Sequence, residues 1–307
     1  MLTIRIVLLV FAASLVSATS FAGTGILLLA HGGNAEWNAR VVELARTIDR
    51  TKPVEVAFGM ATRGNMQAAV DRLADRGVTE IVAVPLFVSS WSSVVTATEY
   101  LLGLRAEAPP ALALFAKMEH PDPVTSPTGA SPVGHDAQAA SLGTTPVASR
   151  VPITRMTPAL NGHRLVAGIL TARAQSISRN PAEEAVVIVA HGPSPDEDNN
   201  RWLQDMSALA MAMARTERFA SIDYLTVRDD APKAIRDGAA AQLRAVVSAR
   251  AGEGRRVLIV PLLLSFGGIE RGIATRLEGL PYTMAGAALL PDDRLVTWVL
   301  EMADQAP

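Results

Sequence analysis

The run Ile26-Leu27-Leu28-Leu29-Ala30-His31-Gly32 recurs as Val186-Val187-Ile188-Val189-Ala190-His191-Gly192 in the second half of the chain. Each run is aliphatic without polar alternation, which is typical of a strand buried on both faces of a parallel sheet. Each histidine then follows the carboxyl end of a strand, the edge where open α/β sheets bind ligands. A single histidine there is usually structural, but the repeated tripeptide favours a functional role in both halves.

Two further segments repeat in the same order. The stretch Val82–Ser89 matches Leu258–Ser265, and Arg164-Leu165-Val166 matches Arg294-Leu295-Val296. The first half contains additional residues at about 118–155, rich in Pro, Ser, Thr, Gly and Ala. Such a composition buries too little apolar surface to order itself, so we expect a flexible insert. Its two histidines, His120 and His135, are expected to be solvated, with a loose metal-capturing tether as the alternative.

Turn residues divide both halves into alternating strands and helices. In the first half we expect strands at 25–30, 54–58, 80–88 and 111–116, and helices at 35–50, 66–75, 94–106 and 163–177. In the second half we expect strands at 185–190, 221–227, 256–264 and 283–289, and helices at 199–214, 231–250, 269–277 and 293–304. This order predicts an α/β fold of two lobes that arose by duplication, residues 23–180 and 181–307, each a parallel sheet flanked by helices.

The N-terminus has the pattern of an export signal. Arg5 precedes an apolar run from Ile6 to Val16, and Ser20-Phe21-Ala22 offers small residues to a signal peptidase. We therefore predict that residues 1–22 are a cleaved signal peptide and that the mature protein is periplasmic. The apolar run is short for a membrane span, although an uncleaved anchor is the alternative.

Charge and cysteine content narrow the function. The chain has 28 basic and 30 acidic residues, so no strongly basic surface is implied, which argues against a nucleic-acid partner. It contains no cysteine, so any metal site must use histidine, carboxylate or carbonyl ligands. The sequence also lacks a Ser/His/Asp order and a glycine-rich phosphate loop, so hydrolase and nucleotide-binding functions rank low among the candidate functions.

Three motifs together resemble those of a known family. They are the Leu-Leu-Ala-His-Gly opening, the Val-Ala-Val-Pro-Leu-Phe-Val-Ser strand with its serine-rich loop, and Pro158-Ala159-Leu160-Asn161-Gly162-His163. The chain is similar to the sirohydrochlorin cobaltochelatases (CbiX-like, class II tetrapyrrole chelatases) in their long, internally duplicated form. The resemblance spans both halves except the insert.

That resemblance implies insertion of a divalent metal into a tetrapyrrole held in the cleft between the lobes, with no organic cofactor. Cobalt is the expected metal, and nickel or iron serve in relatives. His31 would handle the metal in the first lobe and His191 would be its counterpart. Neutral imidazole suits both tasks of such a site, because it binds late first-row divalent ions and accepts protons near neutral pH.

The sequence departs from the family in one respect. Members usually carry a second histidine shortly after the Pro-Leu-Phe strand, where this chain has Ser92-Ser93 in one half and Ile269-Glu270 in the other. Glu270 is the best substitute as a ligand or proton acceptor. Glu99 is a weaker candidate, and an ordinary solvated helix position explains it equally well.

Several other residues are candidates for contacts with a tetrapyrrole. The hydroxyl groups of Ser89 and Ser90 could bind its carboxylates while Trp91 stacks on the macrocycle or closes the lobe interface. Arg63 and Arg228 each follow the second strand of a half and would pair with a polycarboxylate substrate.

Helix ends account for two remaining features. His163 is expected to act at a helix start rather than as a ligand. Asp196-Glu197-Asp198 resembles an acidic metal cluster, but carboxylates at a helix start are expected for electrostatic reasons alone.

The leading hypothesis is an exported chelatase that inserts cobalt or a similar ion into a sirohydrochlorin-type macrocycle, with catalytic His31 and Glu270 and metal ligands His31 and His191. The alternative is a non-catalytic exported protein that carries a metal or a tetrapyrrole in the same cleft. A purely structural remnant of the duplication ranks third.

Overall fold

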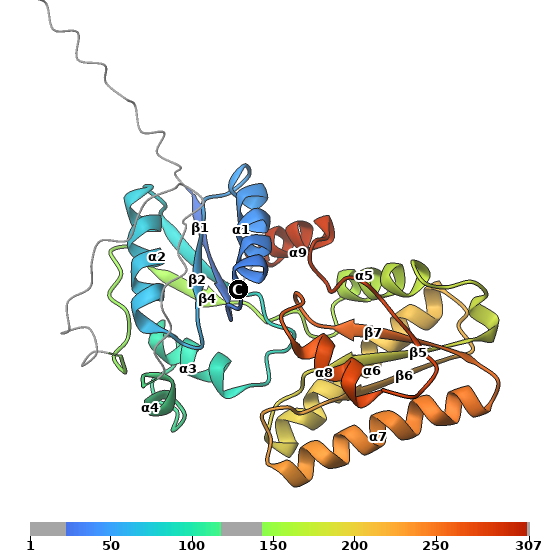
Figure 1. Cartoon of the computed structure of the whole chain (residues 1–307). Coiled ribbons are helices and arrows are strands. Elements are labelled where there is room, and N and C mark those ends of the chain that lie inside the picture. Colours follow the sequence, from blue (N-terminus) through green and yellow to red (C-terminus); the bar gives the residue numbers. More distant parts are fainter. Residues whose placement is uncertain (1–22, 118–142, 306–307) are drawn as a thin grey trace, which may run out of the picture.

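The computed structural model describes residues 23–117 and 143–305. Within them lie two four-stranded parallel sheets with strand orders β2-β1-β3-β4 and β6-β5-β7-β8. The predicted α/β class with two similar lobes is therefore confirmed (Figure 1). The proposed signal peptide, His120 and His135 lie outside the described residues. No helix in the described ranges is both long enough and apolar enough to span a membrane.

The elements of the first half alternate as expected as far as α3. They are β1 (Thr24–Ala30), α1 (Ala35–Asp49), β2 (Val54–Phe58), α2 (Arg63–Asp75), β3 (Glu80–Pro85), α3 (Ser93–Leu101), α4 (Leu112–Phe115), β4 (Ile153–Met156) and α5 (Arg164–Gln175). Those of the second half are β5 (Glu184–Ala190), α6 (Asp196–Thr216), β6 (Ser221–Thr226), α7 (Lys233–Gly252), β7 (Arg256–Leu262), α8 (Ile269–Arg276), β8 (Thr283–Met284) and α9 (Asp293–Asp304), with a short 3₁₀ turn at Pro181–Glu183 before β5.

The prediction of a strand at residues 111–116 is wrong. This segment forms the single helical turn α4, whose Leu112 and Phe115 are both buried against the first-lobe core. The fourth strand of the sheet is instead β4, inside the segment predicted to be a flexible insert, and Ile153 pairs with Ile81 of β3. The end of that segment is thus part of the folded lobe.

The duplication extends to individual hydrogen bonds. The backbone N–H groups of Leu160 and Asn161 donate to the carbonyls of Phe87 and Val88, at 3.0 and 2.9 Å. In the second lobe, Leu289 and Leu290 donate in the same way to Leu263 and Leu264, at 2.9 and 2.8 Å. Equivalent segments after the third strand of each lobe therefore share one backbone arrangement.

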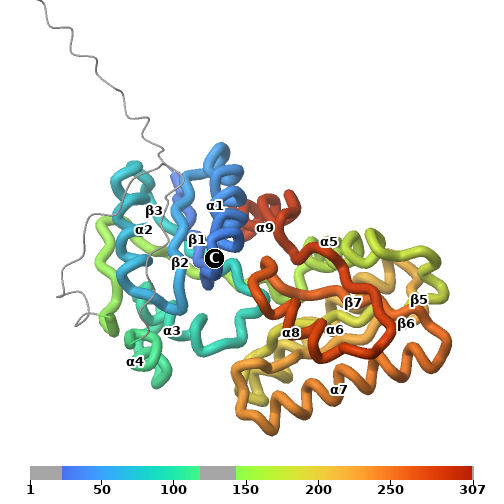
Figure 2. Tube along the Cα trace, viewed as in Figure 1, coloured from blue at the N-terminus to red at the C-terminus, as the bar shows by residue number. Residues whose placement is uncertain are grey.

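The last helix of each half packs on the other half. Helix α5 lies against α6 and β7 of the second lobe, and α9 lies against α1 and β3 of the first. Figure 2 shows α9 beside α1 and α5 above the second sheet. A 2.7 Å ion pair between Arg164 and Glu301 joins the two exchanged helices. One continuous hydrophobic core consequently contains strands of both sheets.

Helix α9 carries the apolar face that this packing requires. Leu295, Trp298, Val299 and Met302 are all buried and recur at the spacing of one helical face. The helix begins at Asp292, whose carboxylate accepts a hydrogen bond from the Arg294 N–H at 3.1 Å.

We expect Trp298→Ala to destabilise the whole molecule, because Trp298 is fully buried in the core shared by the lobes. Its loss should lower the free energy of unfolding by about 3–5 kcal/mol, the usual cost of truncating a buried tryptophan. The measurement is urea unfolding followed by circular dichroism. The exposed neighbour Thr297 provides the control, since Thr297→Ala should change stability by less than about 0.5 kcal/mol. Equal, small effects of both variants would contradict the exchange of α9.

Candidate functional site

His31 lies at the carboxyl end of β1 and is exposed to solvent. Its Nδ1 is 2.8 Å from the carbonyl oxygen of Gly32. A carbonyl oxygen only accepts hydrogen bonds, so this contact requires the proton on Nδ1 and leaves a lone pair on Nε2. Metal-binding histidines are commonly oriented in this way by a backbone carbonyl. In the neutral ring, Nε2 is therefore the nitrogen that keeps a free lone pair.

The turn after His31 is fixed by two asparagines of the following helix start. Asn34 caps α1 by accepting a hydrogen bond from the Trp37 N–H at 2.9 Å. The buried Asn38 accepts from the N–H of Gly33 at 2.9 Å and donates to its carbonyl at 3.2 Å. These bonds hold the backbone beside His31 in one conformation.

His191 occupies the matching position after β5. Its side chain is 26% exposed, and its Nε2 is 3.4 Å from a carboxylate oxygen of Asp230. The glycine that follows is required, because Gly192 has φ +73° and an added Cβ would lie 2.5 Å from the Cβ of Thr226. The second lobe thus repeats the sharp turn but adds an acidic partner for the imidazole.

The serine-rich loop after β3 contacts α6 of the second lobe. The hydroxyl of Ser89 donates to Asp205 at 3.2 Å, and the indole N–H of Trp202 donates to the carbonyl of Trp91 at 2.9 Å. The guanidinium carbon of Arg201 is 4.3 Å from the centroid of the Trp91 ring, a cation–π arrangement. Burial raises the pKa of Asp205, an effect that hydrogen bonds with Ser89 and Trp91 partly offset.

The corresponding loop after β7 contacts the first lobe. A Cβ on Gly267 would lie 3.4 Å from Cδ1 of Trp37, so this backbone packs on the indole. Gly33, two residues after His31, packs on the same indole, since its Cβ would lie 2.9 Å from Trp37 Cγ. Helix α1, which follows His31, is therefore contacted by the loop after β7. Helix α6, which follows His191, is contacted by the loop after β3.

Glu270 lies in this second loop, at the start of α8. Its carboxylate accepts hydrogen bonds from the N–H groups of Gly267 and Gly268 at 3.1 and 2.9 Å. Burial would raise the pKa of Glu270, but bonds from the amides of Gly268, Glu270 itself and Gly267, together with Arg271, outweigh burial and hold the pKa below its ordinary value. A carboxylate stabilised in this way is a weak proton acceptor, so the geometry favours helix capping over the predicted catalytic role.

The two arginines predicted to bind substrate are both engaged within the chain. Arg63 donates to the carbonyls of Thr145 and Pro146 at 2.9 and 3.3 Å, holding the end of the insert against α2. Arg228 is only 11% exposed, donates to the carbonyls of Pro193 and Ser194, and pairs with Asp196 at 2.7 Å. Both guanidinium groups satisfy loop carbonyls.

The two predicted serines are engaged in the same way. Ser89 is buried and contacts Asp205, and the Ser90 hydroxyl accepts from the N–H of Ala159 at 2.9 Å and from the Asn161 side chain at 3.0 Å. Of the predicted trio, Trp91 alone has an exposed side chain, at 37%. Trp91 is thus the member able to meet a ligand.

The helix-end interpretation of His163 is confirmed. It caps α5, and its Nδ1 accepts from the Leu165 N–H at 3.3 Å. Desolvation lowers the pKa of His163 and nearby Arg164 adds to this effect, while Glu301 opposes it.

The acidic residues at the start of α6 also serve the helix and its loop. Asp196 pairs with Arg228, and Glu197 pairs with Arg201 at 2.8 Å. Across the ranges that the structure describes, no three His, Cys, Asp or Glu side chains gather into a group that could hold a metal ion.

Sequence reasoning missed the residues that join the lobes at this place. Trp37, Trp202 and Asp205 were not singled out, because their partners lie more than a hundred residues away or on the other lobe. The one available signal was the presence of large aromatic residues on the two helices that follow the histidines.

Comparison with known proteins supports the resemblance. Residues 25–126 match the CbiX family model, while no curated protein sequence matches the chain. SirB from Bacillus subtilis with Fe3+ superposes with a TM-score of 0.58 at 13% identity, covering 91% of this chain and 94% of that one. The chain has the chelatase fold.

Two further structures agree with this fold. The sirohydrochlorin chelatase SirB from Bacillus subtilis subspecies spizizenii in complex with cobalt gives a TM-score of 0.53 at 13% identity, covering 92% of this chain and 94% of that one. DR2241 from Deinococcus radiodurans, a multi-domain protein with structural similarity to chelatases, gives 0.51 at 16% identity and covers 93% of this chain but 56% of DR2241. The predicted resemblance to CbiX-like chelatases is thus confirmed by the family match in the first lobe and by the fold of the whole.

We expect Glu270→Gln to destabilise the protein by about 1 kcal/mol at pH 7, because the charged acceptor at the start of α8 is lost. The folded-state pKa lies below the ordinary value of 4.5, so the stabilisation is present above pH 4.5 and is lost as the pH falls through the folded-state pKa. Urea unfolding of both proteins between pH 7 and pH 3 measures this difference. A difference that stays constant down to pH 3 would show that the carboxylate does not cap the helix.

Proposed function

We propose that this protein inserts a divalent metal ion into a tetrapyrrole of the sirohydrochlorin type where the two lobes meet. Cobalt is the first metal to test, followed by nickel and iron. The observation that carries the proposal is the pair of histidines at equivalent strand ends, each followed by a helix that the other lobe contacts, within a chelatase fold. SirB structures holding Fe3+ and cobalt support the choice of metals.

The chemistry requires two different groups. Insertion exchanges one divalent ion for the two protons on the pyrrole nitrogens, so the site must hold the ion and also receive protons. His31 suits the first task, since its Nδ1 faces the Gly32 carbonyl and Nε2 remains as a ligand. His191 is the candidate for the second, because an imidazole can accept a proton and this one lies beside a carboxylate, with its Nε2 3.4 Å from Asp230.

The exposed ring of Trp91 is the proposed contact for the macrocycle face. Aromatic side chains commonly stack on planar ligands in such positions. Its indole is already oriented by Arg201 on one face and by the bond from Trp202 to its backbone.

The small number of metal-binding side chains near the histidines favours a second function. The sequence lacks the family's second histidine, and the described residues contain no group of three metal ligands. A non-catalytic protein that carries a metal or a tetrapyrrole would need only binding groups. Under this alternative the same histidines bind the ion but no proton transfer follows.

We expect the mature protein with Co²⁺ and sirohydrochlorin to change the macrocycle absorbance as the metal enters. His31→Ala and His191→Ala should each reduce the rate by at least about tenfold, the usual range for losing a positioned acid or base. His120→Ala and His135→Ala are matched controls and should leave the rate unchanged. An unchanged rate in Glu270→Gln together with loss in His191→Ala supports the paired histidines over the carboxylate.

Titration calorimetry with Co²⁺ separates the two functions. Tight binding that His31→Ala abolishes, without any insertion by the unmodified protein, would establish the carrier. Equal, small losses in all the histidine variants would indicate nonspecific binding and would overturn both functions.

The proposed site of action is the periplasm, with residues 1–22 as a cleaved signal peptide. We expect the mature protein to begin at Gly23, and N-terminal sequencing of the protein recovered from a periplasmic extract measures this. Retention of Met1 on a cytosolic protein would disprove the export proposal while leaving the chemistry unaffected.

A further inference from the structure

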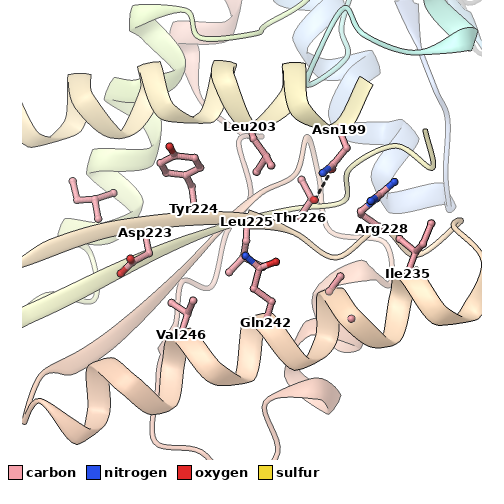
Figure 3. Close-up of a pocket in the computed structure, with 13 residues that line it drawn as sticks. Asn199, Leu203, Asp223, Tyr224, Leu225, Thr226, Arg228, Ile235, Gln242 and Val246 are labelled. Atoms are coloured by element: carbon pink, nitrogen blue, oxygen red, sulfur yellow. Dashed lines mark hydrogen bonds between the residues drawn. The ribbon is translucent and has the colours of Figure 1, made fainter. Parts of the chain in front are cut away.

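A cavity of about 720 Å³ lies beside β6, the edge strand of the second sheet, between α6 and α7. Figure 3 shows Tyr224 and Thr226 on the α6 side of the strand, and Gln242 and Val246 reaching toward it from α7. Its lining combines polar and apolar side chains in similar measure.

The same edge of the first lobe is sealed by side chains. Every residue of β2 is buried. The N–H of Val54 donates to Asp49 at 3.0 Å, its carbonyl accepts from Arg76 at 3.2 Å, and the carbonyl of Phe58 accepts from Asn65 at 2.8 Å. Three backbone groups of Val54 and Phe58 that point away from the sheet are thus satisfied within the chain.

An ion-pair network reinforces this seal. The fully buried Glu55 contacts Arg72 at 2.7 Å and Arg76 at 3.2 Å, and Arg76 also reaches Asp49 at 2.6 Å. Arg72 lies in α2, which packs closely on β2, and Arg76 directly follows that helix. The two guanidinium groups therefore lie along this edge of the first sheet.

The second lobe has different residues at three of the sealing positions. The buried pairs Ala61 with Ala231, Ala69 with Ala239 and Leu73 with Leu243 align α2 with α7. In that alignment Asn65 corresponds to Ile235, Arg72 to Gln242 and Arg76 to Val246. All three replacements line the cavity. The groove therefore lies where the first lobe has an amide and two guanidinium groups.

In the second lobe, β6 has an open strand edge. In a parallel ladder, alternate residues direct their N–H and C=O groups toward the neighbouring strand. Val227 donates to Ala190 of β5 at 2.9 Å, so Ile222, Tyr224 and Thr226 direct their backbone groups away from the sheet. Unpaired edge groups of this kind are a template for another strand.

Charges in the groove are already neutralised. Asp223 forms a two-point pair with Arg250, with both distances 2.8 Å, and Arg228 pairs with Asp196. A ligand that brought its own charge would lose hydration without gaining an unpaired partner. The groove therefore favours an uncharged occupant.

We propose that this groove binds an extended, uncharged peptide segment as an additional strand on β6. The outward groups of Ile222, Tyr224 and Thr226 supply the hydrogen bonds, and Ile235 and Val246 supply apolar contacts. Five residues of β6 span roughly 13 Å at about 3.3 Å per residue, so a peptide of about five residues fits its length. Addition of a strand to an exposed sheet edge is a recurrent mode of peptide recognition.

The test uses the peptide acetyl-Thr-Val-Thr-Val-Thr-amide as the probe. Calorimetry should give a dissociation constant below about 1 mM, and hydrogen exchange should slow at the outward-facing amides of residues 222, 224 and 226. Two further probes carry N-methyl groups on the odd or on the even residues. At least one of them should bind about tenfold more weakly, because methylation removes the N–H groups that face the strand.

The first, groove-closing variant introduces into the groove the residue types that occupy the equivalent positions of the first lobe. Ile235→Asn, Gln242→Arg and Val246→Arg together should reduce binding of the probe at least tenfold. Ala241→Asn, Ala245→Arg and Ser248→Arg introduce the same residue types on the exposed face of α7 and should leave binding unchanged. Thermal unfolding of both variants checks that they are folded.

Three results would overturn the assignment. They are the absence of probe binding at 1 mM and above, equal binding of the methylated and unmethylated probes, and equal binding by the groove-closing and control variants. Concentration-dependent dimerisation that the groove-closing variant abolishes would assign the edge to a second copy of the chain instead. The N-methylated probes keep the test decisive even if the closing variant does not fold.

Discussion

The reciprocal exchange of α5 and α9 is the constraint on which the rest of the molecule depends. A parallel sheet needs helices on both faces, and each sheet here obtains part of its cover from the other half of the chain. The exchanged helices meet where Arg164 and His163 at the start of α5 face Glu301 of α9. Neither lobe can therefore complete its core alone, and the strand ends that carry the histidines are held in a fixed relation.

The local spacing of hydrophobic residues was sufficient to predict the elements that are rich in buried aliphatic residues. The β1 and β5 runs and the amphipathic α9 were predicted almost to the residue, because hydrophobic spacing alone defines them. The prediction of a strand at residues 111–116 failed, because a short apolar stretch with Leu112 and Phe115 three residues apart fits a helical turn as well as a strand. Strand β4 was missed for the opposite reason. It is short and polar, and its order comes from pairing with β3 and from Arg155, which donates to the carbonyls of Met302 and Ala303 in α9.

The candidate site was predictable only in part, for a related reason. Repetition identified His31 and His191, and no distant contact was needed to notice it. Arg63, Arg228 and Ser90 looked available because their residue types suit a polycarboxylate ligand. The structure uses all three to satisfy groups of the surrounding loops, such as the Thr145, Pro193 and Ala159 backbones. Buried and semi-buried loops need such donors and acceptors, and a sequence does not show which polar side chains supply them.

Duplication produced two equivalent positions, but the two lobes now present different chemistry. In the first, the imidazole of His31 is exposed and its neighbour is a neutral carbonyl; in the second, the imidazole of His191 is mostly covered and its neighbour is a carboxylate. A neutral partner that accepts the Nδ1 proton favours a metal ligand, whereas an anionic partner stabilises a ring that has gained a proton. One imidazole cannot bind an ion and accept a proton through the same lone pair at once. Under the proposed function, the two diverged histidines would divide the two required tasks, with each lobe contributing one group.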